Sequence, residues 1–143
     1  MEYPRAWSMQ EHMSVPSLDS LLPKETVGTL FQESASTNTH VFVARLATCP
    51  DLSERGNVEA GDNVVIGGRV FSHASLMDGA AGSVGEFHYY ASAKDASHCT
   101  IIVSFYFHST GEAYDEPQRS QVKRGIAEMQ QVIERMVQSY RDL

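Results

Sequence analysis

The chain has 143 residues, of which 42% are hydrophobic and 20% charged, and its formal net charge is -7 at pH 7. These values are typical of one globular domain that can bury its own core. They argue against nucleic acid or an anionic membrane surface as the main partner, because both require clustered Lys and Arg side chains. No apolar run is long enough for an integral membrane segment. The N-terminus also lacks the basic start and apolar middle of a secretory signal.

The N-terminal part predicts an edge strand, a connection and a helix, in that order. Residues 3–9 are expected to form a short edge strand with Trp7 packed on the body, and residues 10–16 a polar connection. Over residues 17–34, leucine, valine and phenylalanine recur at helical spacing. This spacing predicts a short N-terminal helix, which Pro23 must either break or restart.

The middle of the chain predicts three strands and two long loops. The expected strands are residues 40–46, 64–72 and 86–92, and the expected loops are residues 51–63 and 74–85. Within the second strand, Gly67-Gly68 fits a bulge, a turn or a close backbone approach. In the third strand, Phe87 and Tyr89 should face away from His88 and Tyr90.

The run from His98 to His108 predicts the central strand of the sheet. It is long, rich in β-branched and aromatic residues, and contains no Gly or Pro. The short polar stretch before it predicts a hairpin with the third strand. One face of this strand is almost purely apolar, and we expect the C-terminal helix to cover it. The residues on that face are Cys99, Ile101, Val103, Phe105 and Phe107.

Between Val122 and Tyr140, apolar residues recur at steps of three and four, which predicts a long amphipathic helix. Asp115 or Glu116 with Pro117 would begin it, and Gly125 would permit close contact with the sheet. The predicted fold is therefore a single α+β domain. It consists of an antiparallel sheet of about four to six strands packed against the C-terminal helix, plus the short N-terminal helix.

The two cysteines, Cys49 and Cys99, both fall at predicted strand ends. A disulfide between them would close a loop of about 50 residues and stabilise the fold by about 4 kcal/mol. It would also indicate a periplasmic or extracellular location, since such bonds persist in oxidising compartments. Two buried free thiols, which suit the cytoplasm, and a reactive or metal-bound cysteine are the alternatives.

The six histidines show no metal-ligand spacing, and the chain has no Cys-x-x-Cys pair. His88 and His108 occupy the less apolar faces of their strands and could approach one another, either as surface residues or as part of a metal or catalytic site. No nucleophile motif or phosphate-binding loop is found. We therefore expect no cofactor and no metal, and assign no catalytic residue.

Several short motifs occur in an order typical of a known group. They are Tyr3-Pro4-Arg5-Ala6-Trp7, an early helix, a strand ending in Cys49, the strand with Ile66-Gly67-Gly68-Arg69-Val70-Phe71, the Tyr89-Tyr90 strand, and a Cys99 strand followed by a closing helix. This arrangement resembles the small extracytoplasmic domains of the PsbP-like group, which includes bacterial lipoproteins. The resemblance implies a non-enzymatic α+β module that binds or scaffolds something at the cell envelope.

Two functions agree with these observations. The first is a non-catalytic interaction or ligand-binding domain, with a protein partner or a small apolar ligand. The second is a small-ligand enzyme or binder with a pocket between sheet and helix. That pocket would be lined by His88, Tyr90, Tyr106 and His108, and would contain at least one strongly shifted pKa.

Overall fold

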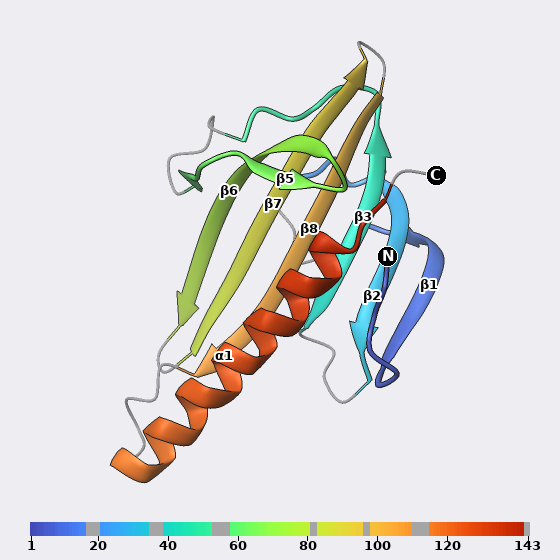
Figure 1. Ribbon diagram of the computed structural model, residues 1–143. Helices are drawn as coiled ribbons and strands as arrows, with labels where there is room; N and C mark the ends of the chain where they lie inside the picture. The colour runs from blue at the N-terminus through green and yellow to red at the C-terminus, as the bar shows by residue number, and fades with distance from the viewer. Residues whose placement is uncertain are drawn as a thin grey trace.

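The computed structural model describes residues 1–16, 21–34, 39–52, 58–80, 83–95, 98–109 and 115–141. These residues form eight strands and one long helix (Figure 1). The elements are β1 (Trp7–Ser14), β2 (Val27–Glu33), β3 (His40–Leu46), β4 (Val58–Ala60), β5 (Val64–Ile66), β6 (Arg69–Ala80), β7 (Ser83–Asp95), β8 (His98–Ser109) and α1 (Glu116–Gln138).

The strands form one antiparallel sheet in the order β1-β2-β3-β8-β7-β6-β4, and β5 pairs with β6 beside this path. The predicted α+β fold with a long C-terminal helix is confirmed, although the sheet has more strands than expected. β8 lies in the middle of the order, as its apolar composition predicts. It forms a hairpin with β7, and the expected bounds of β3 are also confirmed.

The predicted N-terminal helix is wrong. Part of it, residues 17–20, lies outside the described residues. The amide of Thr26 donates to the carbonyl of Pro23 in a turn, and β2 begins directly afterwards. Leu30 and Phe31 are buried in different core clusters, as adjacent residues of a strand must be. A turn followed by a strand with apolar residues on both faces therefore explains why apolar residues recur at helical spacing in this part of the sequence.

Three expected connections also contain strand. Residues 10–14 continue β1, an exposed edge strand whose polar composition hides its extended conformation. Most of the predicted loop at residues 74–85 is the paired arms of β6 and β7, because short side chains weaken the strand signal without preventing pairing. β4 lies within the predicted loop at residues 51–63.

Gly67 and Gly68 form the turn between β5 and β6, so the second predicted strand is two strands. Their φ angles are 59° and 81°. Two consecutive residues with positive φ are typical of a tight two-residue hairpin turn, and glycine adopts this conformation without steric cost. Of the three alternatives for this pair, the turn is observed together with a close backbone approach, because a Cβ added at Gly67 would lie 2.6 Å from the carbonyl oxygen of Tyr140.

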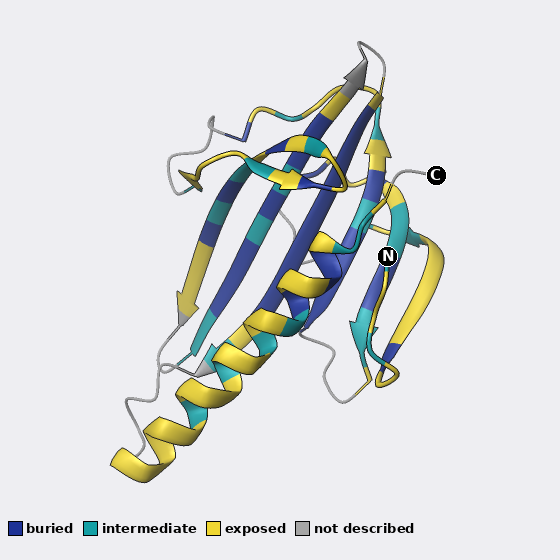
Figure 2. Cartoon of the chain, viewed as in Figure 1, coloured by how far each residue is buried: buried dark blue, intermediate teal, exposed yellow. Residues whose placement is uncertain are grey.

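The sheet buries apolar side chains on both faces. Its buried residues are concentrated in the central strands (Figure 2). One face packs against α1 through Ile133, Met136 and Val137 of the helix. The opposite face carries the apolar side of β8 and is joined there by Leu22 and Leu52 from the connecting segments.

The prediction that α1 covers the Cys99 side of β8 is therefore wrong. The helix packs over the mixed side of the strand, where Ile102 is buried with it and Tyr106 meets Gln130. A helix with both apolar and polar residues on its inner side suits this mixed face. The apolar face is buried without the helix from Cys99 to Phe105, whereas Phe107 at its end is 48% exposed.

Only the C-terminal part of α1 is buried, whereas its N-terminal part is exposed and projects past the sheet (Figure 2). Asp115 caps the helix by accepting a hydrogen bond from the amide of Gln118, which confirms the predicted start. The expected contact of Gly125 with the sheet is wrong, because a Cβ added there would meet no described atom within 4 Å.

A disulfide joins Cys49 to Cys99, with 5.0 Å between their Cα atoms. Leu46 at the end of β3 pairs with Cys99 at the start of β8, and Cys49 follows shortly after. The bond therefore fastens the segment after β3 to the central strand. None of the described residues form a helix with the length and hydrophobicity needed to cross a bilayer.

Candidate functional site

A groove of about 290 Å3 lies between α1 and the β6–β8 part of the sheet. We call it the helix–sheet groove. Its sheet wall carries polar and aromatic side chains, and its helix wall mixes apolar and polar ones. The lining residues are Val64, His73, Glu86, His88, Tyr90, Ser104, Tyr106, Gln130, Ile133, Glu134, Val137 and Gln138.

Strand alternation places these polar groups on one face. Glu86, His88 and Tyr90 are spaced two residues apart on β7, so their side chains point to the same side of the sheet. In the pairing with β8, Glu86 lies opposite Tyr106, and His88 lies opposite Ser104. Residues paired directly across two strands share a face, so the register brings both β8 side chains to the same wall.

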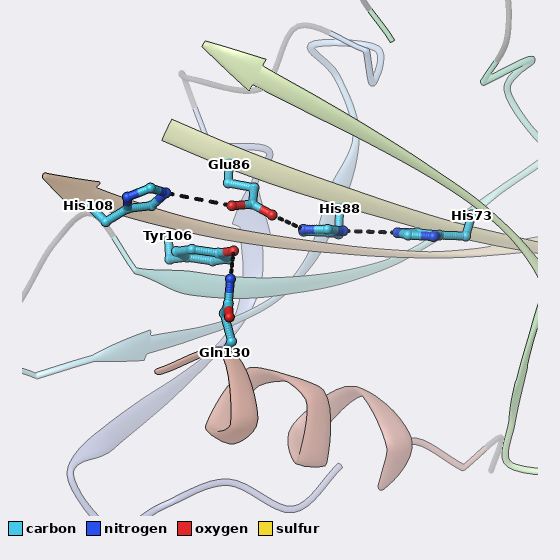
Figure 3. A network of polar contacts seen from close by, with 6 residues as sticks. All are labelled: His73, Glu86, His88, Tyr106, His108 and Gln130. Carbon is cyan, nitrogen blue, oxygen red and sulfur yellow. Dashed lines mark hydrogen bonds and ion pairs between the residues drawn. The ribbon is translucent and has the colours of Figure 1, made fainter. Parts of the chain in front are cut away.

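Glu86 is the centre of a chain of polar contacts (Figure 3). Its Oε1 atom is 2.7 Å from Nε2 of His88, and its Oε2 atom is 3.6 Å from Nε2 of His108. The other ring nitrogen of His88, Nδ1, is 2.9 Å from Nε2 of His73. The carboxylate can only accept, so Nε2 of His88 carries a proton. When His88 is neutral, its Nδ1 accepts a hydrogen bond that the Nε2–H group of His73 donates.

The rings along this chain are stacked. The ring of His73 lies 4.7 Å from that of Tyr90 and 5.2 Å from that of His88, with interplanar angles of 12° and 9°. The series continues from His88 to Tyr106 at 6.4 Å and from Tyr106 to His108 at 5.6 Å. Each ring limits the movement of the next, so the polar atoms of these side chains are held in fixed positions.

Helix α1 joins the network through Gln130, whose side-chain amide donates to the Tyr106 hydroxyl over 2.7 Å (Figure 3). Burial alone would raise the pKa of Glu86, but hydrogen bonds from Tyr106 and His88 and the nearby histidines lower it overall. Burial and the hydrogen bond to Glu86 raise the pKa of Tyr106. Near neutral pH the pair is therefore a carboxylate and a neutral phenol.

Two further groups in the groove have shifted pKa values. Burial, together with the negative charges of Glu134 and Glu86, raises the pKa of Tyr90 to about 12. Burial, together with His88, lowers the pKa of His73. Both shifts favour the neutral form of the side chain at neutral pH.

The Ser104 hydroxyl is buried and has no hydrogen-bond partner among the described residues. A buried hydroxyl without a partner costs about 1 to 3 kcal/mol, so most such groups in folded proteins are satisfied. Ser104 lines the groove, where a bound molecule or an ordered water could complete its hydrogen bonding.

The structure brings three of the four candidate residues into the groove, namely His88, Tyr90 and Tyr106. His108 does not line it but contacts Glu86 on the same face. Sequence reasoning missed the other polar members, which are His73, Glu86, Ser104, Gln130, Glu134 and Gln138. Glu86 and Ser104 could have been found from strand alternation, since each lies two residues from a candidate residue.

No group of three or more His, Cys, Asp or Glu side chains in the described ranges is arranged to hold a metal ion. The network instead joins two imidazoles and a carboxylate by direct hydrogen bonds, which use the atoms that would bind a metal. What the arrangement can do is donate and accept hydrogen bonds at several fixed points along one wall.

A second hollow, of about 580 Å3, lies over β1–β3 beside the C-terminal end of the chain. Its walls include the exposed apolar residues Met9 and Val27, with Arg45 and Arg141 among its charged groups. It is wider than the helix–sheet groove, and none of the side-chain atoms identified as buried and unpartnered belongs to its lining residues.

Comparison of the chain with protein-family models, with curated proteins and with solved structures finds no match in any of the three.

Proposed function

We propose that this protein is a non-catalytic domain that binds a small polar molecule in the helix–sheet groove. The observation that carries the proposal is the Ser104 hydroxyl, which is buried at the groove and lacks a partner among the described residues. A groove of about 290 Å3 is at the lower end of the size range of small-molecule sites. The lining combines fixed polar groups with the apolar side chains of Val64, Ile133 and Val137, and small-molecule sites contain both kinds of group.

Binding is favoured over catalysis by the way His88 is used. Its Nε2 atom faces Glu86 and its Nδ1 atom faces His73, so both ring nitrogens are occupied within the network. A serine nucleophile needs a base hydrogen-bonded to its hydroxyl. Ser104 makes no such bond with His88, although the two residues are paired across β7 and β8.

The Cys49–Cys99 disulfide supports an extracytoplasmic location, periplasmic or extracellular, for this binding domain. The resemblance to the PsbP-like group agrees with a binding role at the cell envelope. We retain that relationship as a proposal.

A fragment screen observed by two-dimensional NMR tests the binding site. Gln130→Trp would fill the groove with an indole ring, and Gln131→Trp is the matched control, because that neighbouring glutamine is exposed on α1 and does not line the groove. We expect polar fragments to shift the amide signals around Ser104 and Tyr90, and to lose affinity at least tenfold in Gln130→Trp alone. Fragments that shift only signals around Met9 and Val27 would place binding in the second hollow and overturn the proposal.

A further inference from the structure

We infer that the ligand of the helix–sheet groove carries a positive charge, as a protonated amine on a small, partly apolar body. This inference rests on the proposed function and adds the chemical class of the ligand. Three observations carry it: the acidic side chains that line the groove, the effect of both acids on Tyr90, and the unpartnered hydroxyl of Ser104.

The charged groups that line the groove are acidic. Glu86 lies on the sheet wall and Glu134 on the helix wall, and no Lys or Arg is among the lining residues. The basic side chains nearest in sequence to Glu134 lie elsewhere, since Arg135 lines a different hollow. Among the described lining residues an anionic ligand would therefore meet two carboxylates and no Lys or Arg, whereas an ammonium group would meet a carboxylate on each wall, with His88 and His108 in contact with that of Glu86.

The two carboxylates act on the same place. Both raise the pKa of Tyr90, which lies on the sheet wall between them and His73. The negative potential thus extends to the Tyr90 hydroxyl and does not remain local to either acid. His73 does not cancel this potential, because burial lowers its pKa and keeps it neutral at pH 7.

The remaining lining suits an amine with a small apolar body. Ser104 offers an unpartnered oxygen that can accept a hydrogen bond from an ammonium group. Val64, Ile133 and Val137 provide apolar wall, and the ring of Tyr90 provides an aromatic surface, which attracts cations. Acceptors of two kinds therefore lie close to apolar surface within a groove that admits only a small molecule.

The test uses three probes with one skeleton and different charges: benzylamine, benzyl alcohol and benzoate. Each is titrated into the full chain at pH 7 and low ionic strength, and the amide signals around Ser104 and Tyr90 are followed by NMR. Low salt keeps the electrostatic contribution measurable. We expect benzylamine to bind at least tenfold more tightly than benzyl alcohol, and benzoate to bind most weakly.

Charge-removing variants identify the acids responsible. Glu134→Gln removes the exposed carboxylate of the helix wall and should weaken benzylamine binding about threefold to fivefold, the range of an exposed ion pair. Glu128→Gln is the matched control, since Glu128 is exposed on the same helix and does not line the groove. It removes the same charge and should leave the affinity unchanged. Glu86→Gln should weaken binding at least tenfold, and Glu134→Gln serves if the buried substitution unfolds the chain.

Two results would overturn the inference. One is binding of benzoate or benzyl alcohol at least as tight as that of benzylamine, or no binding of benzylamine at all. The other is equal loss of benzylamine affinity in Glu134→Gln and Glu128→Gln, which would mean that net charge alone attracts the amine. Neither result contradicts the groove as a binding site, because that proposal is overturned by other results, namely signal shifts confined to the surroundings of Met9 and Val27 or no effect of Gln130→Trp in the fragment screen.

Discussion

Glu86 and His88 lie two residues apart on one face of β7, and the Oε1 atom of the carboxylate is 2.7 Å from Nε2 of the imidazole. A strand places such residues side by side on the same wall. The contact restricts His88 to one orientation and presents its other nitrogen to His73. The same contact therefore helps to stabilise the sheet and fixes the positions of two side chains that line the groove.

We predict that Glu86→Gln lowers the free energy of unfolding by about 1 to 3 kcal/mol near pH 6, because it removes a charge-assisted hydrogen bond from a nearly buried group. The pKa of Glu86 is lowered in the folded state. The carboxylate therefore stabilises the fold above the ordinary pKa of 4.5, and this stabilisation disappears as the pH falls through the lowered pKa.

Urea unfolding of wild type and variant at pH 6 and at pH 3 measures the effect. The difference between the two proteins should shrink at the lower pH. Glu128→Gln, on the exposed side of α1, should change stability by less than about 0.5 kcal/mol. A difference that stays constant with pH would contradict an ionised Glu86 in the folded protein.

His40 provides a second pH-dependent contribution. It is buried on β3 beside Phe105, with ring centroids 5.3 Å apart, and burial lowers its pKa from 6.5 to about 4. As the pH falls, His40 is therefore protonated at a higher pH in the unfolded chain than in the folded protein. Stability that is fully present above pH 6.5 should be lost progressively between pH 6.5 and pH 4, by about 3 kcal/mol in total.

The check is to measure the free energy of unfolding every half unit across this window in wild type and in His40→Phe, which retains a buried ring that cannot be charged. The variant should show a flatter dependence on pH. His12→Asn is the control, since His12 is exposed on the edge strand and asparagine tolerates its positive φ of 56°. An unchanged slope in His40→Phe would rule out His40 as the source.

Removal of the disulfide should destabilise the fold by about 4 kcal/mol, because the bond joins positions separated by 50 residues and restricts the unfolded chain. Denaturant unfolding of the oxidised protein, the reduced protein and the double variant Cys49→Ala, Cys99→Ala measures this loss. The reduced protein and the double variant should agree. A reductant that leaves the unfolding midpoint unchanged would contradict a structural role for the bond.

Two glycines should respond to alanine in opposite directions. Gly125 lies in α1 with open space around it, so Gly125→Ala should stabilise the protein by up to about 1 kcal/mol through helix propensity. Gly67 has a φ of 59°, and an added Cβ would lie 2.6 Å from the carbonyl oxygen of Tyr140. Gly67→Ala should destabilise by more than about 1 kcal/mol. Thermal unfolding compares the two variants, and a destabilising Gly125→Ala would indicate a contact with the sheet after all.

Local patterns were sufficient for the elements whose periodicity is strong. The alternation in β3 and β8 located both strands, and the change to helical spacing after β8 located α1, with Asp115 or Glu116 as the two candidates for its start. Local patterns failed in segments whose amino-acid composition does not indicate the conformation that they adopt. Polar residues in β1 and short ones in β6 form strands because a neighbouring strand pairs with them, which is a property of the partner and not of the local sequence.

The groove depends on still more distant relationships. Tyr106 and Gln130 meet because α1 packs over the mixed face of β8, whereas the apolar face offered the stronger hydrophobic signal. His73 reaches His88 through the register of β6 and β7. Amino-acid order along one segment specifies its periodicity, and hence its strand or helix. Which side chains converge on a common space is decided by packing between segments, because those contacts join residues that no local pattern relates.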